Sequence, residues 1–286
     1  MRILLTGASG FTGSHFKLHA DQAGHEVVPL NADLTDPVSV QKGVKETGPV
    51  DAVVHLAAIS FVGHANDAEF YAVNTVGTTH LLAALAAQPA INRPYKVLAA
   101  SSANVYGNCQ HSPIAETQPL APVNHYAASK LAMEHMAKTY IDRLPIIITR
   151  PFNYTGPGQS SEFLVPKLVD HFIHRKDSIE LGNLEIAREF NDVGFVVQAY
   201  LDLLCAGQPG ETYNICTGTS HKLSDVLNML TELTGHNLKI EKKPHLIRNS
   251  EIMNLTGDPT KLKNTLPKLN TKTLRVTLAE MLSVTK

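Results

Sequence analysis

The sequence predicts an α/β protein in which a doubly wound, parallel sheet is accompanied by a smaller C-terminal lobe. Two observations support this fold class. Short apolar runs alternate with runs of helical periodicity through residues 1–152, which is the pattern of repeated strand-helix-strand units. The chain also has 286 residues, of which 43% are hydrophobic and 18% are charged, so it can bury a substantial core.

The elements of the first half follow one another at regular intervals. We expect strands at residues 2–6, 25–30, 49–58, 95–103 and 144–152, and helices at residues 14–24, 38–47, 74–87 and 126–140. The third strand, within PVDAVVHLAA, is rich enough in valine to be buried on both faces, as strands of parallel sheets are. This regularity favours a sheet whose strands are joined by helices.

Glycines mark the junction between the first strand and the first helix. In TGASGFTG, Gly7, Gly10 and Gly13 stand at three-residue spacing, and Phe11 lies within the same turn. Glycine lets the backbone turn tightly and approach a pyrophosphate, whose charge meets the N-terminus of the helix. The spacing differs from the common GxGxxG, and a purely structural corner is the alternative. The position of the turn favours a Rossmann-type sheet that binds a dinucleotide.

Two further stretches are expected to contact this dinucleotide. Leu56, Ala57 and Ala58 end the third strand, where small side chains leave room for a flat ring. Asp33 and Leu34 follow the second strand and are expected beside the adenine. A turn or a helix cap is an equally good interpretation of the aspartate.

The sequence leaves the choice between NADH and NADPH open. The second strand ends in Leu30 and Asn31, without the acidic residue that holds the ribose hydroxyls of NAD. Neither this strand end nor the glycine turn offers an arginine for the 2'-phosphate of NADPH.

The second half of the chain is more broken and predicts a smaller lobe that binds the substrate. Two of its segments are expected to return to the sheet, a helix at residues 192–207 and a short strand at 211–218. The predicted boundary is therefore discontinuous. The dinucleotide-binding domain would comprise residues 1–152 and 190–218, and the substrate-binding lobe residues 153–189 and 219–286.

A tyrosine and a lysine one helical turn apart form the candidate catalytic pair. Of the eight tyrosines, only Tyr126 has a lysine four residues later, Lys130. A nearby cation favours the phenolate of a tyrosine, whose pKa is normally about 10, and suits it to exchange a proton with an alcohol or ketone. Taken alone, the spacing is also typical of a surface pair. Ser102, on the preceding segment, is the third candidate.

Taken in order, TGASGFTG, HLAA, SSANVYG and YAASK resemble the extended short-chain dehydrogenase/reductase family along nearly the whole chain. This resemblance implies that Tyr126 is the acid/base, that Lys130 binds the nicotinamide ribose and lowers the pKa of Tyr126, and that Ser102 binds the reacting oxygen. It also implies NADH or NADPH as cofactor. A homodimer is expected through helices near 74–87 and 125–140, although core packing explains their apolar stripes equally well.

The residues after Ser102 narrow the reaction. Members of this family that remove water from a nucleotide sugar carry an acidic pair or a glutamate there, whereas this chain has Ala103 and Asn104. An amide cannot accept a proton, so dehydration is not expected. Asn104 is expected to hydrogen-bond the sugar, with a turn amide as the alternative.

Two later stretches, TRPFNYTGPGQ and LGNLEIAREF, resemble members that act on GDP-activated hexoses. The resemblance implies that Asn153 contacts the sugar diphosphate and that Arg188 holds the phosphates, with Asn183 nearby. An arginine fork matches a diphosphate, which lets a chain of net charge -1 bind an anion. A surface ion pair is the alternative for Arg188.

The resemblance thus implies hydride transfer to the C4 ketone of GDP-4-keto-6-deoxy-D-mannose, giving GDP-D-rhamnose (GDP-6-deoxy-D-mannose). The C4 epimer, GDP-6-deoxy-D-talose, stays open as a product. A nucleotide-sugar epimerase that keeps NAD tightly bound would use the same three residues. A non-catalytic dinucleotide sensor is a further alternative, against which the intact Ser102, Tyr126 and Lys130 argue.

The composition argues against other classes of partner. The chain has 25 basic and 26 acidic residues and no long basic run, so neither nucleic acid nor a membrane surface is expected as a partner. Cys109, Cys205 and Cys216 lack CxxC spacing and favour a reducing cytoplasm. No apolar stretch is long enough to span a bilayer. Pairs such as His15 and His19 lack an evident third ligand, so no metal is expected.

Overall fold

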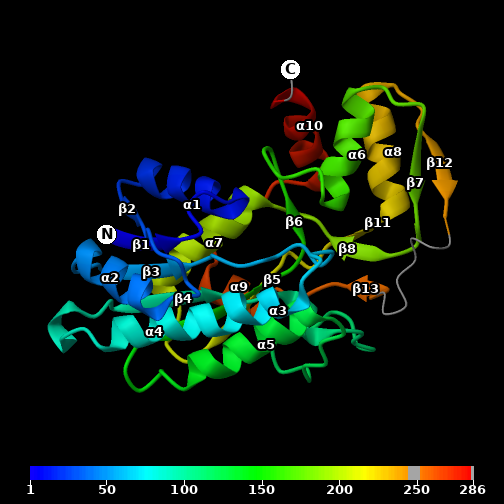
Figure 1. The fold of residues 1–286 in the computed structure, drawn as a ribbon. Helices are drawn as coiled ribbons and strands as arrows, with labels where there is room; N and C mark the ends of the chain where they lie inside the picture. The colour runs from blue at the N-terminus through cyan, green and yellow to red at the C-terminus, as the bar shows by residue number, and fades with distance from the viewer. Residues whose placement is uncertain (244–251, 285–286) are drawn as a thin grey trace.

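A parallel sheet forms the centre of the computed structural model, which describes residues 1–243 and 252–284 (Figure 1). Its six strands lie in the order β10-β5-β4-β3-β1-β2, and every neighbouring pair is parallel. The strands are β1 (Arg2–Thr6), β2 (Glu26–Pro29), β3 (Ala52–His55), β4 (Lys96–Ala100), β5 (Ile146–Pro151) and β10 (Thr212–Ile215). The strand order reverses beside β1, and ligands bind in the crevice at such a reversal. The predicted doubly wound α/β fold is confirmed.

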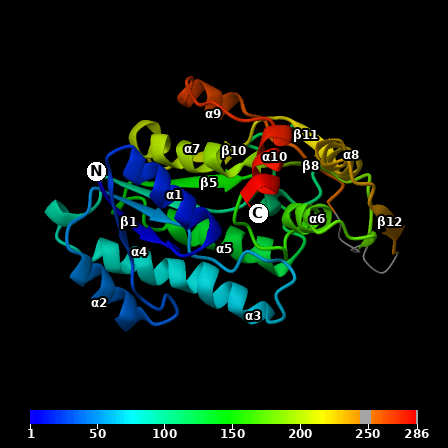
Figure 2. The ribbon, with the colours of Figure 1, turned by 90° about the horizontal axis from the view of Figure 1, so that it is seen from above.

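Helices cover both faces of this sheet, as Figure 2 shows from above. The larger ones are α1 (Phe11–Gln22), α2 (Pro37–Thr47), α4 (Thr78–Ala86), α5 (His125–Lys138) and α7 (Val193–Ala206). The helices α1 and α7 share one apolar core with the sheet, in which Phe16 is fully buried. The helices α2, α4 and α5 share the core of the other face, which includes Leu81. The sheet is therefore buried on both sides.

Most predicted elements differ by a few residues in extent from the observed ones, and three of these differences bear on the site. The helix expected at 74–87 starts earlier, as α3 (Asp67–Phe70) and a π-helix, Tyr71–Gly77, that runs into α4. The strand expected at 49–58 ends at His55, because the next two backbone amides bond to the hydroxyl of Thr6 rather than to a neighbouring strand. The strand expected at 95–103 ends at Ala100 and gives way to a 3-10 turn.

The second half forms its own apolar core beside the sheet, at the right of Figure 1. The helices of this core are α6 (Leu164–Ile173), α8 (Leu223–Thr234) and α10 (Leu274–Val284). The short strands of the second half that lie outside the main sheet are β6 (Tyr154–Thr155), β7 (Ser178–Leu181), β8 (Ala187–Glu189), β9 (Asn191–Asp192), β11 (Ser220–Lys222), β12 (Lys239–Lys242) and β13 (Asn254–Leu255). The strand β8 lies between β11 and β13. The expected strand at 211–218 is β10, which forms the edge of the main sheet.

The chain returns to the sheet again after β13. The helix α9 (Thr260–Thr265) packs against β10, and its Leu262 lies in the core shared by α1 and α7. The exact division of the chain between two domains stays a prediction. Among the described residues, no helix combines the length and the apolar character that crossing a membrane requires.

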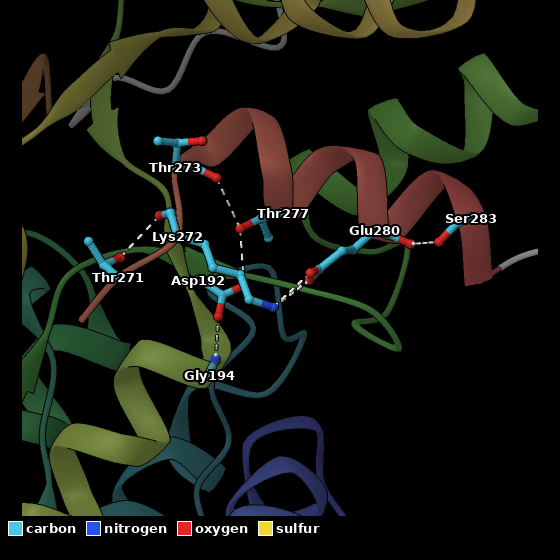
Figure 3. Close-up of polar contacts among 8 residues, drawn as sticks. All are labelled: Asp192, Gly194, Thr271, Lys272, Thr273, Thr277, Glu280 and Ser283. Atoms are coloured by element: carbon cyan, nitrogen blue, oxygen red, sulfur yellow. Dashed lines mark hydrogen bonds and ion pairs between the residues drawn. The ribbon is translucent and has the colours of Figure 1, made fainter. Parts of the chain in front are cut away.

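The C-terminal helix is tied to α7 through one carboxylate (Figure 3). Asp192 caps α7, because its Oδ1 accepts a hydrogen bond from the amide of Gly194 at 2.8 Å. Its Oδ2 accepts a second bond, from the hydroxyl of Thr277 in α10 at 3.0 Å. Lys272, just before α10, bonds both carboxylate oxygens of Glu280 at 2.7 and 2.8 Å. The second core is thereby held against the first.

Candidate active site

Tyr126 and Lys130 lie one turn apart at the start of α5. The helix begins here because Asn124 caps it, with its Oδ1 accepting a hydrogen bond from the amide of Ala127 at 2.8 Å. Tyr126 is 8% exposed and Lys130 is 5% exposed. The surface pair that the spacing alone permits is therefore excluded, and both polar groups lie inside the protein.

Lys130 joins the catalytic helix to the end of β4. Its Nζ donates a hydrogen bond to the carbonyl of Ala100, the last residue of that strand, at 2.7 Å. Burial lowers the pKa of Lys130 to about 8, although the negative charge of Glu134 opposes this shift. Ser102 follows two residues after Ala100, so one backbone segment brings the serine, the lysine and the tyrosine together.

The pKa of Tyr126 differs from the sequence expectation. We expected the lysine to lower it, but burial raises the pKa of Tyr126 to about 12. The neighbouring hydroxyl of Ser102 opposes this shift, and that of Tyr154 adds to it. The expected lowering is therefore wrong for this structure. Its phenol is fully protonated at neutral pH, which is the form that donates a proton.

Ser102 also caps the 3-10 turn Ala103–Tyr106. Its Oγ lies 3.2 Å from both the backbone amide and the side-chain Nδ2 of Asn104, and it accepts a hydrogen bond from each. Because both lone pairs are engaged, the single proton of Ser102 remains for the tyrosine or for a substrate oxygen. The amide of Asn104 is thus turned toward the serine, and Ala103 is buried. Neither residue can accept a proton.

The glycine turn meets the loop after β3 at close range. A Cβ on Gly7, whose φ is 70°, would lie 2.8 Å from the amide nitrogen of Ala57, and a Cβ on Gly13 would lie 2.1 Å from the carbonyl oxygen of Gly7. The structural interpretation of these glycines is therefore partly correct. Gly10 begins α1 without a side-chain cap, and this fits a diphosphate at the helix N-terminus. The residues present suit a dinucleotide.

Phe11 and Asp33 lie in different surroundings. The ring of Phe11 stacks on that of Tyr154, with the ring centroids 6.2 Å apart. The carboxylate of Asp33 is exposed and accepts two hydrogen bonds from Thr35, at 2.8 Å from the amide and 2.7 Å from the hydroxyl, which lower its pKa. Asp33 thus forms the turn that is the alternative prediction for it. Its contact with adenine stays a prediction, as does that of the buried Leu34.

The candidate sugar-nucleotide residues lie in the second half. Asn153 is exposed, and its carbonyl accepts a hydrogen bond from the amide of Asn191 at 2.9 Å, which joins β6 to β9. The guanidinium of Arg188 donates to the backbone carbonyls of Ala187 and Ile252. Asn183 caps its own turn through the amide of Glu185, at 2.9 Å. No hydrogen bond between these described side chains and Tyr126 is present, so their joint role stays a prediction.

Sequence reasoning missed two residues beside these candidates. Tyr154 follows Asn153 directly, and its hydroxyl lies 2.8 Å from that of Thr12 at the start of α1. Glu189 follows Arg188, is completely buried, and accepts hydrogen bonds from the amides of Gly257 at 2.7 Å and Thr217 at 2.8 Å. Only their position next to a recognised motif could have identified them, because their partners are distant in the sequence.

The fold and the buried Ser-Tyr-Lys set define an oxidoreductase of the extended short-chain dehydrogenase/reductase type. A family model described as GDP-mannose 4,6 dehydratase matches residues 17–281, and the chain belongs to this family.

Two curated relatives are similar to nearly all of the chain. The GDP-6-deoxy-D-talose 4-dehydrogenase of Aggregatibacter actinomycetemcomitans is 38% identical over 271 residues, which are 93% of this chain and 91% of the relative. The GDP-6-deoxy-D-mannose reductase of Pseudomonas aeruginosa is 32% identical over 280 residues, 92% of this chain and 90% of the relative. Neither relative is named as a dehydratase.

Two solved structures are similar to the whole fold. A protein from Burkholderia cenocepacia J2315, provisionally assigned as an epimerase, superposes with a TM-score of 0.92 at 40% identity, covering 99% of this chain and 97% of that one. The structure of RMD from Pseudomonas aeruginosa complexed with NADPH has a TM-score of 0.89 at 30% identity and covers 99% of this chain and 96% of that one.

Proposed function

We propose that this protein reduces the C4 ketone of GDP-4-keto-6-deoxy-D-mannose to GDP-D-rhamnose. It is an NAD(P)-dependent oxidoreductase, and NADPH or NADH supplies the hydride when bound. The observation that carries the proposal is the buried Ser102, Tyr126 and Lys130 beside Ala103 and Asn104. Ser102, Tyr126 and Lys130 suit proton transfer to a ketone. Neither Ala103 nor Asn104 can act as the base that dehydration needs.

In this mechanism Tyr126 is the general acid. Its phenol gives a proton to the oxygen on C4 as that oxygen gains negative charge, and Ser102 orients the oxygen through its remaining hydroxyl proton. Lys130 keeps a positive charge next to the reacting groups while its Nζ holds the end of β4. The buried position of all three excludes water from the reaction.

We further propose that the sugar nucleotide binds across the two halves of the chain. Asn104 and Asn153 would contact the sugar side, and Arg188, with Asn183 nearby, would hold the diphosphate of GDP.

A second product is supported by one observation. The relative at 38% identity is named for GDP-6-deoxy-D-talose, whereas the relative at 32% is named for GDP-6-deoxy-D-mannose. The two products differ only in the face of C4 that receives the hydride. GDP-6-deoxy-D-talose is therefore the second candidate product.

One experiment tests the reaction and its stereochemistry. GDP-4-keto-6-deoxy-D-mannose is incubated with the protein and NADPH or NADH, the loss of absorbance is followed, and the product is identified by NMR. Stoichiometric oxidation with GDP-D-rhamnose as product is expected. Interconversion of sugars without net oxidation would instead establish an epimerase, and a lack of sugar-nucleotide binding in calorimetry would support a dinucleotide sensor.

We also propose a cytoplasmic homodimer formed through α4 and α5 together with the π-helix before α4. Val76 in the π-helix is 46% exposed and Met136 in α5 is 38% exposed, although both belong to helices that pack on each other. Exposed apolar side chains on adjacent helices suit a symmetric helix bundle. Sedimentation of the protein and of a Val76→Glu variant would test it, and a monomeric parent would refute it.

A further inference from the structure

A buried chain of hydrogen bonds underlies the crevice between β1 and β3. Its central member is His55, the last residue of β3, which is 4% exposed. Its Nδ1 lies 2.7 Å from the hydroxyl of Thr6 and its Nε2 lies 2.8 Å from the hydroxyl of Thr78. The oxygen of Thr6 also accepts bonds from the amides of Leu56 and Ala57, at 3.1 and 3.0 Å. We call Thr6, His55 and Thr78 the His55 chain.

The donors and acceptors of the His55 chain determine which atom carries the proton in each of its hydrogen bonds. The hydroxyl of Thr78 donates its only proton to the carbonyl of Asn74, at 2.6 Å, and must therefore accept from Nε2–H of His55. Nδ1 of the neutral ring is then an acceptor, and the hydroxyl of Thr6 donates to it. The two lone pairs of Thr6 remain for the two backbone amides. This arrangement requires His55 to be neutral, with its proton on Nε2.

The surroundings of His55 maintain this neutral form. A charged ring would carry a proton on Nδ1 and present it to the oxygen of Thr6, which already accepts two hydrogen bonds. Burial, together with the positive charge of Lys130, lowers the pKa of His55 to about 3. The ring therefore acts as a connector with one donor and one acceptor and takes no part in proton transfer near neutral pH.

The His55 chain reaches the catalytic helix through Asn74. The side chain of this π-helix residue brackets Ile59, accepting from its amide at 2.9 Å and donating to its carbonyl at 3.1 Å. Nδ2 of Asn74 also donates to Ser129 Oγ at 3.0 Å, and Ser129 donates to the carbonyl of Tyr126 at 2.8 Å. Thr6 and Asn74 thus hold the loop 56–59 at its two ends.

This loop decides how the glycine turn packs. Because a Cβ on Gly7 would lie 2.8 Å from the amide nitrogen of Ala57, the turn rests directly on the group that Thr6 holds. A displaced Ala57 amide would move the glycine turn and, with it, the uncapped N-terminus of α1. The loop and the turn form the two sides of the crevice where the sheet order reverses.

We propose that His55 is a positioning residue that sets the width of the dinucleotide crevice, by locking the glycine turn, the loop 56–59 and the Tyr126 helix together. The inference rests on the dinucleotide-binding part of the proposed function and is independent of the sugar. It predicts that loss of the hydrogen bonds of the His55 chain costs more free energy of dinucleotide binding than free energy of unfolding.

The test compares Thr6→Val with Thr6→Ser. Valine keeps the shape of threonine but removes the hydroxyl, which leaves two amides and Nδ1 of His55 without their partner, whereas serine keeps the hydroxyl. We expect Thr6→Val to raise the Kd of NADPH about tenfold in calorimetry and Thr6→Ser to stay within about threefold of the parent. The KM of the sugar nucleotide should change less than that of the dinucleotide.

Variants of His55 and a control variant at Thr79 complete the series. His55→Asn keeps an acceptor for Thr6 and should raise the Kd less than His55→Leu, which keeps neither bond. The control is Thr79→Val, because Thr79 makes the same bond to the carbonyl four residues earlier, at 3.0 Å, outside the His55 chain. A Thr6→Val protein with the parental Kd and only a lower Tm would refute the inference. A parent that binds neither NADPH nor NADH would refute the proposed function together with it.

Discussion

Replacing Tyr126 by phenylalanine isolates the proposed proton donor. The change deletes only the phenolic oxygen, while the ring keeps its contact with Phe70, at a centroid distance of 6.1 Å. Because the ring is retained and no cavity forms, the free energy of unfolding should change by about 1 kcal/mol or less. Dinucleotide binding should be retained. Turnover should fall by about 10²- to 10⁴-fold, the usual contribution of a general acid.

The assay is the loss of NADPH absorbance with GDP-4-keto-6-deoxy-D-mannose, beside a calorimetric titration of NADPH. The matched control is Tyr95→Phe, because Tyr95 is 48% exposed and lies just before β4, at the opposite end of the strand from Ser102. A Tyr126→Phe protein that keeps more than about a tenth of the parental turnover would contradict the role of the phenol as general acid.

Three further predictions concern groups around this site. Burial lowers the pKa of Lys130 to about 8 and raises that of Tyr126 to about 12. As pH rises through about 8, Lys130 loses its positive charge while Tyr126 stays protonated, so kcat/KM should fall. In a pH–rate profile, Lys130→Met should abolish this dependence. Glu134→Ala removes the carboxylate that accepts hydrogen bonds from Nη2 and Nε of the buried Arg150, at 2.7 and 2.9 Å. Because the guanidinium is then buried without its counter-charge, the free energy of unfolding in urea should fall by about 3–5 kcal/mol. Thr277→Val should lower it by about 1–2 kcal/mol, and an unchanged value would contradict the role of its bond to Asp192.

The sheet and its order of elements could be predicted because each signal is local. Apolar runs with valine and isoleucine mark the strands, and Asn124 and Asp192 start helices through bonds to amides two or three residues away. The three catalytic candidates could also be predicted, since two of them lie on one helical turn.

The remaining features of the site depend on contacts between distant segments. The raised pKa of Tyr126 comes from burial by several elements. The spacing of a tyrosine and a lysine in the sequence does not show how deeply either residue is buried. The His55 chain joins Thr6 to Thr78, residues that no periodicity links. Asp33 shows the opposite case, because its bonds to Thr35 are local and the turn was one of its two predicted roles.

The edge strand β10 has a consequence for how the chain is made. It pairs with β5, all of whose residues are buried in the finished sheet, but the whole segment from β6 to α7 is synthesised between these two strands. Until residue 215 has left the ribosome, β5 presents an unpaired apolar edge, and such edges recruit strands from other chains. We therefore expect truncated translation products that stop before β10 to aggregate, and chaperones to be needed chiefly during this interval.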